Sequence, residues 1–368
     1  MEKLKKPLII VCGGFVILFI FLFIMSSCNK KTYTTEQFSD YLLTKAKEYF
    51  KTNKDALPKN DGNKVSLSIG SLVENQSDYL KDTTCSGSID VINNNGYYLY
   101  VPNINCSDGF GGQKLTDYLI NKDITTNAHD LYQMNGDYVY RGDNVNNYLV
   151  FDEQVYRILR INEDGTLRII ETDYKIKNDK DKISYKANRR TSTTWDNRIN
   201  PEKNYASGFN DFIHDGINSR IKDKLDDIYK KDFSDKAKAY IVKQNLCVGK
   251  RSMSDTINDG SIECSLTLEN QYVGLLPIYE YLNASLDPSC ISIESKTCRN
   301  YNYLTDIKST YWSMTAVKEN SYDVFKIGNT ITDATASSSA TPKVVLNLSK
   351  EVRFSNGDGS KENPYIIN

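Results

Sequence analysis

At 368 residues the chain has room for about two domains, at the usual ~100–200 residues per domain. The net charge is −1, and beyond residue 31 there are 41 basic against 46 acidic residues, which gives −5. This balance argues against nucleic acid as a partner, because binding to phosphates requires a basic face.

The first predicted element is a membrane-spanning helix at Leu8–Met25, a run of eighteen residues without a charge inside an uncharged stretch at residues 7–28. A helix of this length covers most of a ~30 Å hydrocarbon core. Three lysines precede the segment and two follow it, a bias that favours a cytoplasmic N-terminus. We therefore expect residues 1–30 to form a cytoplasmic tail and an uncleaved single-pass anchor, with the bulk of the chain extracellular.

Two other interpretations of this segment remain open. Met25-Ser26-Ser27-Cys28 approximates the small-residue box of a lipoprotein signal, which makes Cys28 a possible lipidation site. Gly14-Phe15 imitates a pilin-type cleavage site, but Phe19 occupies the position where the pilin pattern has Glu.

The six cysteines beyond Cys28 indicate structural disulfides. Six cysteines allow many pairings, and we assign the pairing that is local in sequence. The knuckle spacing of a zinc site is absent, and thiol catalysis needs a base although the chain has only two histidines. The sequence thus predicts no catalytic, cofactor or metal residues, and it predicts the disulfides Cys85–Cys106, Cys247–Cys264 and Cys290–Cys298.

Residues 31–125 are predicted to form a small α+β domain. Thr34 and Gln37 have the spacing of a capping box, and they open a helix with an apolar stripe from Phe38 to Phe50. Asn95-Gly96 separates two β-prone runs and predicts a hairpin, since both turn positions need positive φ. Cys85 and Cys106 would join the outer ends of that hairpin.

This order, an apolar N-terminal helix, an amphipathic helix and a small disulfide-closed sheet, resembles the globular part of type IV pilin-like proteins over about residues 8–108. The resemblance implies a pilin-like α+β stalk on a permanent anchor.

Residues 130–368 are predicted to form a larger, β-rich α+β domain. Strands are expected at Tyr138–Tyr140, Tyr148–Phe151, Gln154–Ile161 and Thr166–Glu171, with a turn at Asn162–Gly165 between the last two. The three- and four-residue recurrence of apolar residues from Phe209 to Ile228 predicts a helix over residues 210–230, with His214 in a structural role beside its apolar face. A shorter helix is expected over Ser234–Val242.

Two short motifs in this domain have functional and structural interpretations. Arg141-Gly142-Asp143 is a tripeptide that some adhesion receptors recognise, but a Gly-Asp turn explains it equally well. The acidic segment Asp255–Cys264 invites a calcium site, but Ile257 and Leu266 occupy ligand positions of the EF-hand template. A disulfide-closed loop is the better explanation of this segment.

The C-terminal part is predicted to be mainly strands, with Trp312 in the core. Tyr365–Ile367 is expected to form an edge strand against Val352–Phe354, because Pro364 can begin a strand but cannot lie inside one. The other strands are expected at Tyr311–Thr315, Tyr322–Ile327 and Lys343–Leu348.

Several segments here resemble a module of exported or anchored proteins of unknown function in low-GC Gram-positive bacteria. They are Gln271–Ser285, Asn300–Leu304, Tyr311–Thr315, Pro342–Leu348 and the ending from Gly357. The resemblance covers about residues 136–368. The module is distantly similar to C-type-lectin-like and sulfatase-modifying-factor folds, and it implies an exported protein without assigning any active-site residue.

The sequence favours a non-catalytic binding or adhesion protein for a glycan, a peptide or a host surface. It contains no nucleophile elbow, P-loop or dinucleotide fingerprint. Its 46 acidic residues beyond the anchor leave one alternative, a cell-wall or carbohydrate-active enzyme that uses paired carboxylates.

Overall fold

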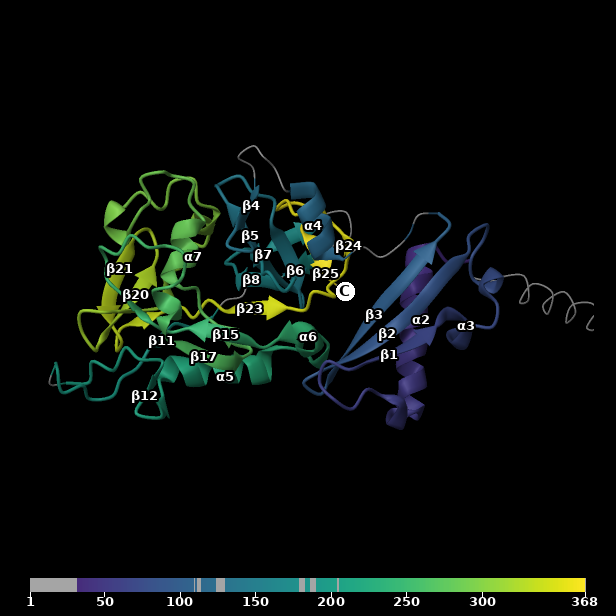
Figure 1. Cartoon of the computed structure of the whole chain (residues 1–368), viewed down its shortest axis with the longest axis horizontal. Coiled ribbons are helices and arrows are strands. Elements are labelled where there is room, and N and C mark those ends of the chain that lie inside the picture. The colour runs from purple at the N-terminus through teal and green to yellow at the C-terminus, as the bar shows by residue number, and fades with distance from the viewer. Residues whose placement is uncertain are drawn as a thin grey trace, which may run out of the picture. The chain divides into compact units, whose positions relative to one another are not determined.

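The computed structural model describes residues 32–108, 110, 114–123, 130–178, 183–185, 190–203 and 205–367. These residues form an α+β protein with two compact units (Figure 1). Of the described residues, the first unit contains those from residue 32 to Lys59, those of Asn63–Val91 and those between Tyr100 and Phe110, and the second contains the rest. The sequence predicted the domain boundary at residues 125–130. In the structure the helix at Leu115–Asp123, which precedes that boundary, belongs to the second unit.

None of the described helices is long and apolar enough to cross a membrane. The predicted span at residues 7–28 lies outside the described residues, as does the possible lipidation site Cys28.

The first unit begins with α2 (Thr35–Thr52), and its predicted capping box is confirmed. Gln37 N–H donates to the Thr34 hydroxyl at 3.2 Å, and Thr34 N–H donates to Gln37 Oε1 at 3.1 Å. Phe38, Leu42 and Phe50 are buried as predicted, and Figure 1 shows α2 lying across one face of a small sheet. The unit also contains η1 (Lys54–Ala56), β1 (Lys64–Ser68), α3 (Ile69–Leu72) and η2 (Gln76–Asp78).

The small sheet has the strand order β1-β2-β3 and contains the predicted hairpin. β2 (Cys85–Asn94) and β3 (Tyr97–Cys106) are joined by Asn95 and Gly96, whose φ angles of 51° and 86° are the positive values that this turn requires. A disulfide links Cys85 to Cys106 and so closes the open end of the hairpin.

The second unit is organised around a ten-stranded sheet. Its path is β14-β23-β8-β7-β6-β25-β24; β5 pairs with β7 and β4, and β18 pairs with β23. The strands are β4 (Asp130–Met134), β5 (Asp137–Arg141), β6 (Tyr148–Phe151), β7 (Gln154–Ile161), β8 (Leu167–Glu171), β14 (Ile241–Val242), β18 (Val273–Gly274), β23 (Val345–Leu348), β24 (Phe354–Asn356) and β25 (Tyr365–Ile367). The prediction for β25 is wrong in one respect. It pairs with β24, which shares only Phe354 with the predicted partner segment Val352–Phe354, and it also runs parallel to β6, so it is not an edge strand.

A four-stranded sheet with the order β16-β19-β20-β21 packs against the same core. It consists of β16 (Lys250–Arg251), β19 (Tyr311–Val317), β20 (Asp323–Ile327) and β21 (Ile331–Thr335). Four two-stranded pairs complete the strands: β9 (Ile176–Asn178) with β10 (Ile183–Tyr185), β11 (Thr193–Thr194) with β22 (Ser339–Ala340), β12 (Ile213–His214) with β13 (Ile217–Asn218), and β15 (Gln244–Cys247) with β17 (Thr267–Gln271).

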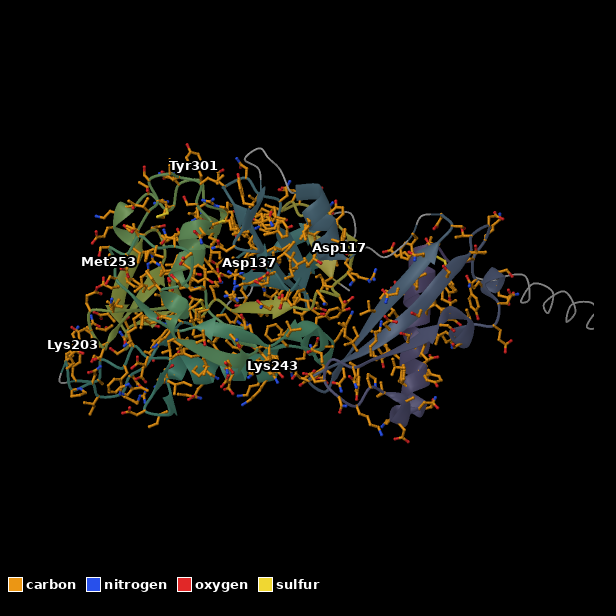
Figure 2. All side chains as sticks on the ribbon, in the orientation of Figure 1. Asp117, Asp137, Lys203, Lys243, Met253 and Tyr301 are labelled. Atoms are coloured by element: carbon orange, nitrogen blue, oxygen red, sulfur yellow. A yellow bond between two sulfur atoms is a disulfide. The ribbon has the colours of Figure 1, made fainter. Side chains whose placement is uncertain are left out.

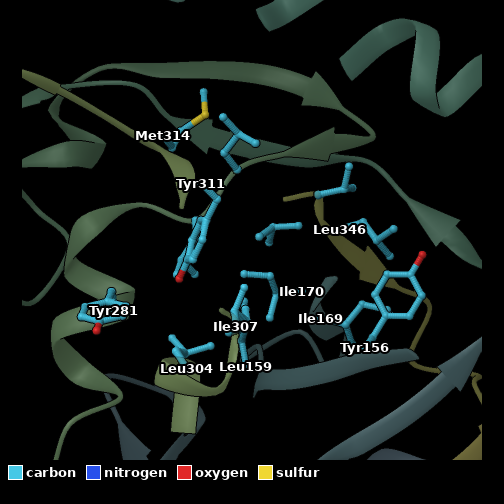
Figure 3. Packing of buried hydrophobic residues seen from close by; sticks show 14 of the residues in the cluster. Tyr156, Leu159, Ile169, Ile170, Tyr281, Leu304, Ile307, Tyr311, Met314 and Leu346 are labelled. Atoms are coloured by element: carbon cyan, nitrogen blue, oxygen red, sulfur yellow. The ribbon is translucent and has the colours of Figure 1, made fainter. Parts of the chain in front are cut away.

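The helices of the second unit are short. They are α4 (Leu115–Asp123), α5 (Arg220–Asp232), α6 (Asp235–Tyr240), α7 (Ile278–Asn283), η3 (Glu263–Ser265), η4 (Ile293–Ser295) and η5 (Tyr303–Asp306). Apolar side chains from both sheets and from α5 belong to one buried cluster. Figure 3 shows Ile169 and Leu346 of the long sheet in this core together with Tyr311 of the smaller sheet. Trp312 is 0% exposed, which confirms its predicted place in the core.

Candidate functional site

Three side chains of the second unit form a stack at its surface. The His214 imidazole lies against the Phe209 ring, with centroids 3.7 Å apart and 13° between the planes. The Arg198 guanidinium carbon lies 5.3 Å from the centroid of the same ring. Stacking and cation–π attraction both favour this arrangement, and we call these three residues the aromatic stack.

Buried polar groups hold the stack in place. The Asp196 carboxylate accepts Arg198 Nε–H at 3.0 Å and the Phe209 backbone N–H at 2.9 Å, so one buried acid positions two members of the stack. Gly208 allows this approach, because its φ is 77° and a Cβ there would lie 2.4 Å from the Asp196 carbonyl oxygen. The buried Asn210 amide donates to three carbonyl oxygens at the β19–β20 turn, those of Val317, Asn320 and Asp323.

Asp211 bridges His214 and Lys250 at the edge of the stack. One carboxylate oxygen lies 2.8 Å from His214 Nδ1, and the other lies 2.8 Å from Lys250 Nζ. Partial burial raises the pKa of Asp211, but hydrogen bonds from Lys250 and His214 outweigh this effect and leave the pKa below its ordinary value. Asp211 is therefore an anion that fixes the orientation of the imidazole at neutral pH.

The sequence did not predict this site, because it assigned residues 210–230 to one helix. Asp215 and Gly216, with φ of 49° and 74°, instead make a tight turn between β12 and β13. The helix α5 begins only after Ser219, whose hydroxyl caps it by accepting Lys222 N–H. The Asp215-Gly216 pair was the sequence signal for this turn. The spacing of the apolar residues on either side of it also matched a helix, and the helix was predicted instead. His214 thus belongs to a hairpin and is 27% exposed.

Exposed apolar side chains occur on the two segments that carry the stack. Ile213 and Ile217 on the β12–β13 hairpin are 37% and 59% exposed. On the loop after Asp196, Ile199 and Tyr205 are 74% and 55% exposed, and the Asn200–Tyr205 bridge holds that loop closed. Figure 2 shows Lys203 of this loop at an extremity of the second unit. We call the aromatic stack with Ile199, Tyr205, Ile213 and Ile217 the stack surface.

All three predicted disulfides are present. Cys85 pairs with Cys106, Cys247 with Cys264 and Cys290 with Cys298. The last two close loops of the second unit, and these loops are tied together because Asn258 Nδ2 donates to the Ile291 carbonyl oxygen at 3.0 Å. Exposed apolar residues occur here as well, namely Ile257, Leu266 and Ile291.

The polar groups of the calcium candidate segment are already used within the fold. Arg251 Nη2 donates to the Asp255 carbonyl oxygen at 2.9 Å and to Asn258 Oδ1 at 2.5 Å, and Asp259 accepts from Ser261. Among the described residues, no cluster of His, Cys, Asp and Glu has the arrangement of a metal site. Arg141 of the adhesion-like tripeptide is also engaged, because Nε donates to the Asn283 carbonyl oxygen at 2.7 Å.

Three glutamates are buried in the second unit, and arginines bind each of them. Glu280 accepts from Arg168 at 3.0 Å and lies 3.0 Å from Arg160 Nη1. The other pairs are Glu171 with Arg190 and Glu263 with Arg251. Burial raises the pKa of Glu280, but the charges of the two arginines outweigh it and leave the pKa below its ordinary value. None of these pairs was predicted. Glu280 lies more than a hundred residues from its arginines, and Glu171 and Glu263 lie 19 and 12 positions from theirs, so no local sequence pattern marks any of them.

The cavities beside Arg160 and Glu280 are small. Their volumes are about 30 and 20 Å³, which gives room for water rather than for a sugar ring. A larger pocket of about 240 Å³ lies between α6 and the β6–β7 turn, and its lining includes Phe151, Asp152, Lys236 and Tyr240. This volume is below the ~300–1,000 Å³ that is typical of small-molecule sites. The stack surface is therefore the stronger candidate.

Comparison with known proteins returns no match: no family model, no curated protein sequence and no solved structure is similar to this chain.

Proposed function

We propose that the chain is a single-pass, membrane-anchored cell-surface protein, and that its second unit binds a polypeptide ligand through the stack surface. One observation carries this proposal: four exposed apolar side chains lie on the same two segments as a polar frame that is already fixed by buried hydrogen bonds. Exposed apolar groups on a preorganised frame are typical of recognition surfaces, since little conformational entropy is lost when a partner binds.

The composition of the stack surface favours a polypeptide over a glycan. Its exposed groups are three isoleucines and one tyrosine, and His214 already covers one face of the Phe209 ring. A sugar ring usually stacks on a free aromatic face, whereas isoleucine side chains suit the apolar centre of a protein interface. Glycan binding is therefore the alternative outcome of the test below.

The proposed location rests on the N-terminal sequence and on the cysteines. Leu8–Met25 is uncharged and follows a lysine-rich tail, and three disulfides are typical of a protein outside the reducing cytoplasm. The first unit, with one long helix and a small disulfide-closed sheet, agrees with the pilin-like layout of a stalk.

Protease added to intact, wall-stripped cells tests the location. It should remove the bulk of the chain, and complete protection would contradict the proposed topology. Metabolic labelling with a fatty acid separates the two kinds of anchor. A diacylglyceryl group on Cys28 would show a lipoprotein in place of the uncleaved helix.

Peptide-library selection and a glycan array, both with the full-length chain, test the binding function. Ile217→Asp places a charge on the stack surface, and Leu266→Asp is the matched control, because the two side chains are 59% and 60% exposed on different segments. We expect Ile217→Asp to weaken selected peptides about tenfold or more, which is about 1.4 kcal/mol, while the control leaves affinity unchanged. Equal effects of the two variants, or glycan ligands alone, would refute the polypeptide assignment. Chemical turnover of any bound ligand would revive the enzyme alternative.

A further inference from the structure

Lys343 is a fully buried lysine two residues before β23. It is 0% exposed, which is rare for a lysine because its ammonium loses hydration. Nζ lies 2.5 Å from Asp173 Oδ1 and 3.3 Å from the Thr172 carbonyl oxygen. The aspartate is the partly exposed member of the pair, since its side chain is 27% exposed.

The two residues meet because β8 and β23 are antiparallel neighbours in the long sheet. Ile170 pairs with Val345, and the ladder continues through Glu171 N–H, which donates to the Val344 carbonyl oxygen at 3.0 Å. Asp173 lies two residues after β8 and Lys343 lies two residues before β23, so the two residues meet at the same end of this strand pair although 170 positions separate them in sequence. Their contact therefore depends on the central pairing of the sheet and not on a flexible surface side chain.

We infer that Lys343 and Asp173 condense to an intramolecular amide between Nζ and Cγ, which links β8 to β23 covalently. The site combines an amine, a carboxyl group in contact with it and nearly complete exclusion of water from the amine. Two reacting groups held in contact have a very high effective concentration, which removes most of the entropic barrier to amide formation. This inference does not rest on the proposed binding function.

The starting state is an ammonium beside a carboxylate. Burial raises the pKa of Asp173, but hydrogen bonds from Lys343 and Ser309 outweigh this and leave it below its ordinary value. The first step is transfer of one proton from Nζ to Oδ1, which gives a neutral amine and a carboxylic acid.

The amide bond then forms by attack of Nζ on Cγ. The nitrogen lone pair becomes the C–N bond, and the C=O π electrons move to Oδ2. A second proton passes from Nζ to Oδ1, the Cγ–Oδ1 bond breaks with its electron pair, and one water leaves as Oδ2 regains its double bond. No oxidant, reductant or co-reactant is needed.

Ser309 is placed to assist this step. Its backbone N–H donates to Asp173 Oδ2 at 2.8 Å, where negative charge develops, and its hydroxyl lies 3.2 Å from Oδ1. A fixed donor at the developing oxyanion stabilises a tetrahedral intermediate. The Thr172 carbonyl oxygen accepts from Nζ and orients the amine. Lys343 and Asp173 are thus the reacting groups, and Ser309 and Thr172 position them.

Peptide mapping of the full-length chain, purified in detergent, tests the inference. After reduction and alkylation, trypsin should fail to cut after Lys343 in most molecules. The fragment that contains Lys343 should be joined to the fragment that contains Asp173, with a combined mass lower by one water. Free fragments in full yield, or a link from Lys343 to a different carboxylate, would overturn the inference.

Two controls make this result specific. Lys222 Nζ also lies 2.5 Å from the Asp226 carboxylate, but this pair lies on α5 with the aspartate side chain 37% exposed, so it should remain unlinked. Lys343→Arg keeps the positive charge without a comparable nucleophile, and it should abolish the joined fragment. If the loss of water persists in Lys343→Arg, it arises within the aspartate fragment alone and the amide is refuted.

Discussion

We expect that neutralising Glu280 lowers the free energy of unfolding more than neutralising any other single side chain of the second unit. Glu280 is buried, and it accepts hydrogen bonds from Arg168 Nε at 3.0 Å and from the Tyr279 hydroxyl at 3.1 Å, while Arg160 Nη1 lies 3.0 Å away. In Glu280→Gln the carboxamide carries no charge, and its N–H₂ group faces arginine donors. The buried Arg168 then loses its carboxylate partner, and the partly buried Arg160 keeps only Asp137.

The expected loss follows from the cost of an unpaired buried charge. Removing one partner of a buried ion pair typically costs about 3–5 kcal/mol of the free energy of unfolding. With a urea dependence of about 2–3 kcal/mol per molar, the midpoint of urea unfolding should fall by about 1–2 M. Glu269→Gln is the control, because this exposed glutamate on β17 should change the free energy by less than about 0.5 kcal/mol.

Tryptophan fluorescence during urea titration measures this effect in the second unit alone. The only two tryptophans of the chain, Trp195 and Trp312, are both buried there, and their rings are 5.9 Å apart. The full-length chain is therefore suitable, since the first unit contributes no tryptophan signal. An unchanged midpoint for Glu280→Gln would refute the assignment of this glutamate as an ionised counter-ion.

The pH dependence of the same difference provides a second check. Because the pKa of Glu280 in the folded chain is below its ordinary value of about 4.3, its stabilising contribution is complete above that value. The contribution is lost as the pH falls through the folded-state pKa. The gap in stability between the wild-type chain and Glu280→Gln should therefore narrow below about pH 4. A gap of constant size would mean that packing, and not charge, causes the loss.

Two further predictions use the same fluorescence assay. Gly208→Ala should cost about 1–3 kcal/mol through backbone strain at φ 77°, with an added clash at the Asp196 carbonyl oxygen; Gly216→Ala, which has strain at φ 74° but open space, should cost less. Equal losses would show that the close approach is unimportant. Replacing Cys247 and Cys264 together by serine should lower the free energy of unfolding by about 3 kcal/mol, since their disulfide spans 17 residues, and an unchanged midpoint would contradict this.

Local features of the fold could be predicted from the sequence, because their causes are local. The capping box at Thr34 and Gln37, the Asn95-Gly96 hairpin and the three short-range disulfides depend on residues close together in the chain. The α+β class and most strands of the long sheet followed from the same kind of pattern. In each case hydrogen-bond geometry or backbone conformation restricts which residues can occupy the position.

Apolar periodicity alone misled the prediction around His214. The spacing of Phe209, Ile213 and Ile217 matched a helix, but the backbone turns at Asp215 and Gly216. Asn210 gives a second reason why the predicted helix does not form here. Its side-chain amide donates to carbonyl oxygens of the β19–β20 turn, more than a hundred residues later in the chain. Such a long-range anchor overrides a local helical preference, and no window of sequence contains it.

Only the tertiary structure decided which charged residues are buried and with which partners. Arg160 and Arg168 meet Glu280 across more than a hundred residues, and Lys343 meets Asp173 across 170. The sequence determined that these charges exist, but their environment depends on which strands pair in the long sheet. Strand pairing brings distant residues together at a cost in chain entropy that the whole core must offset, so these contacts exist only once the entire domain has folded.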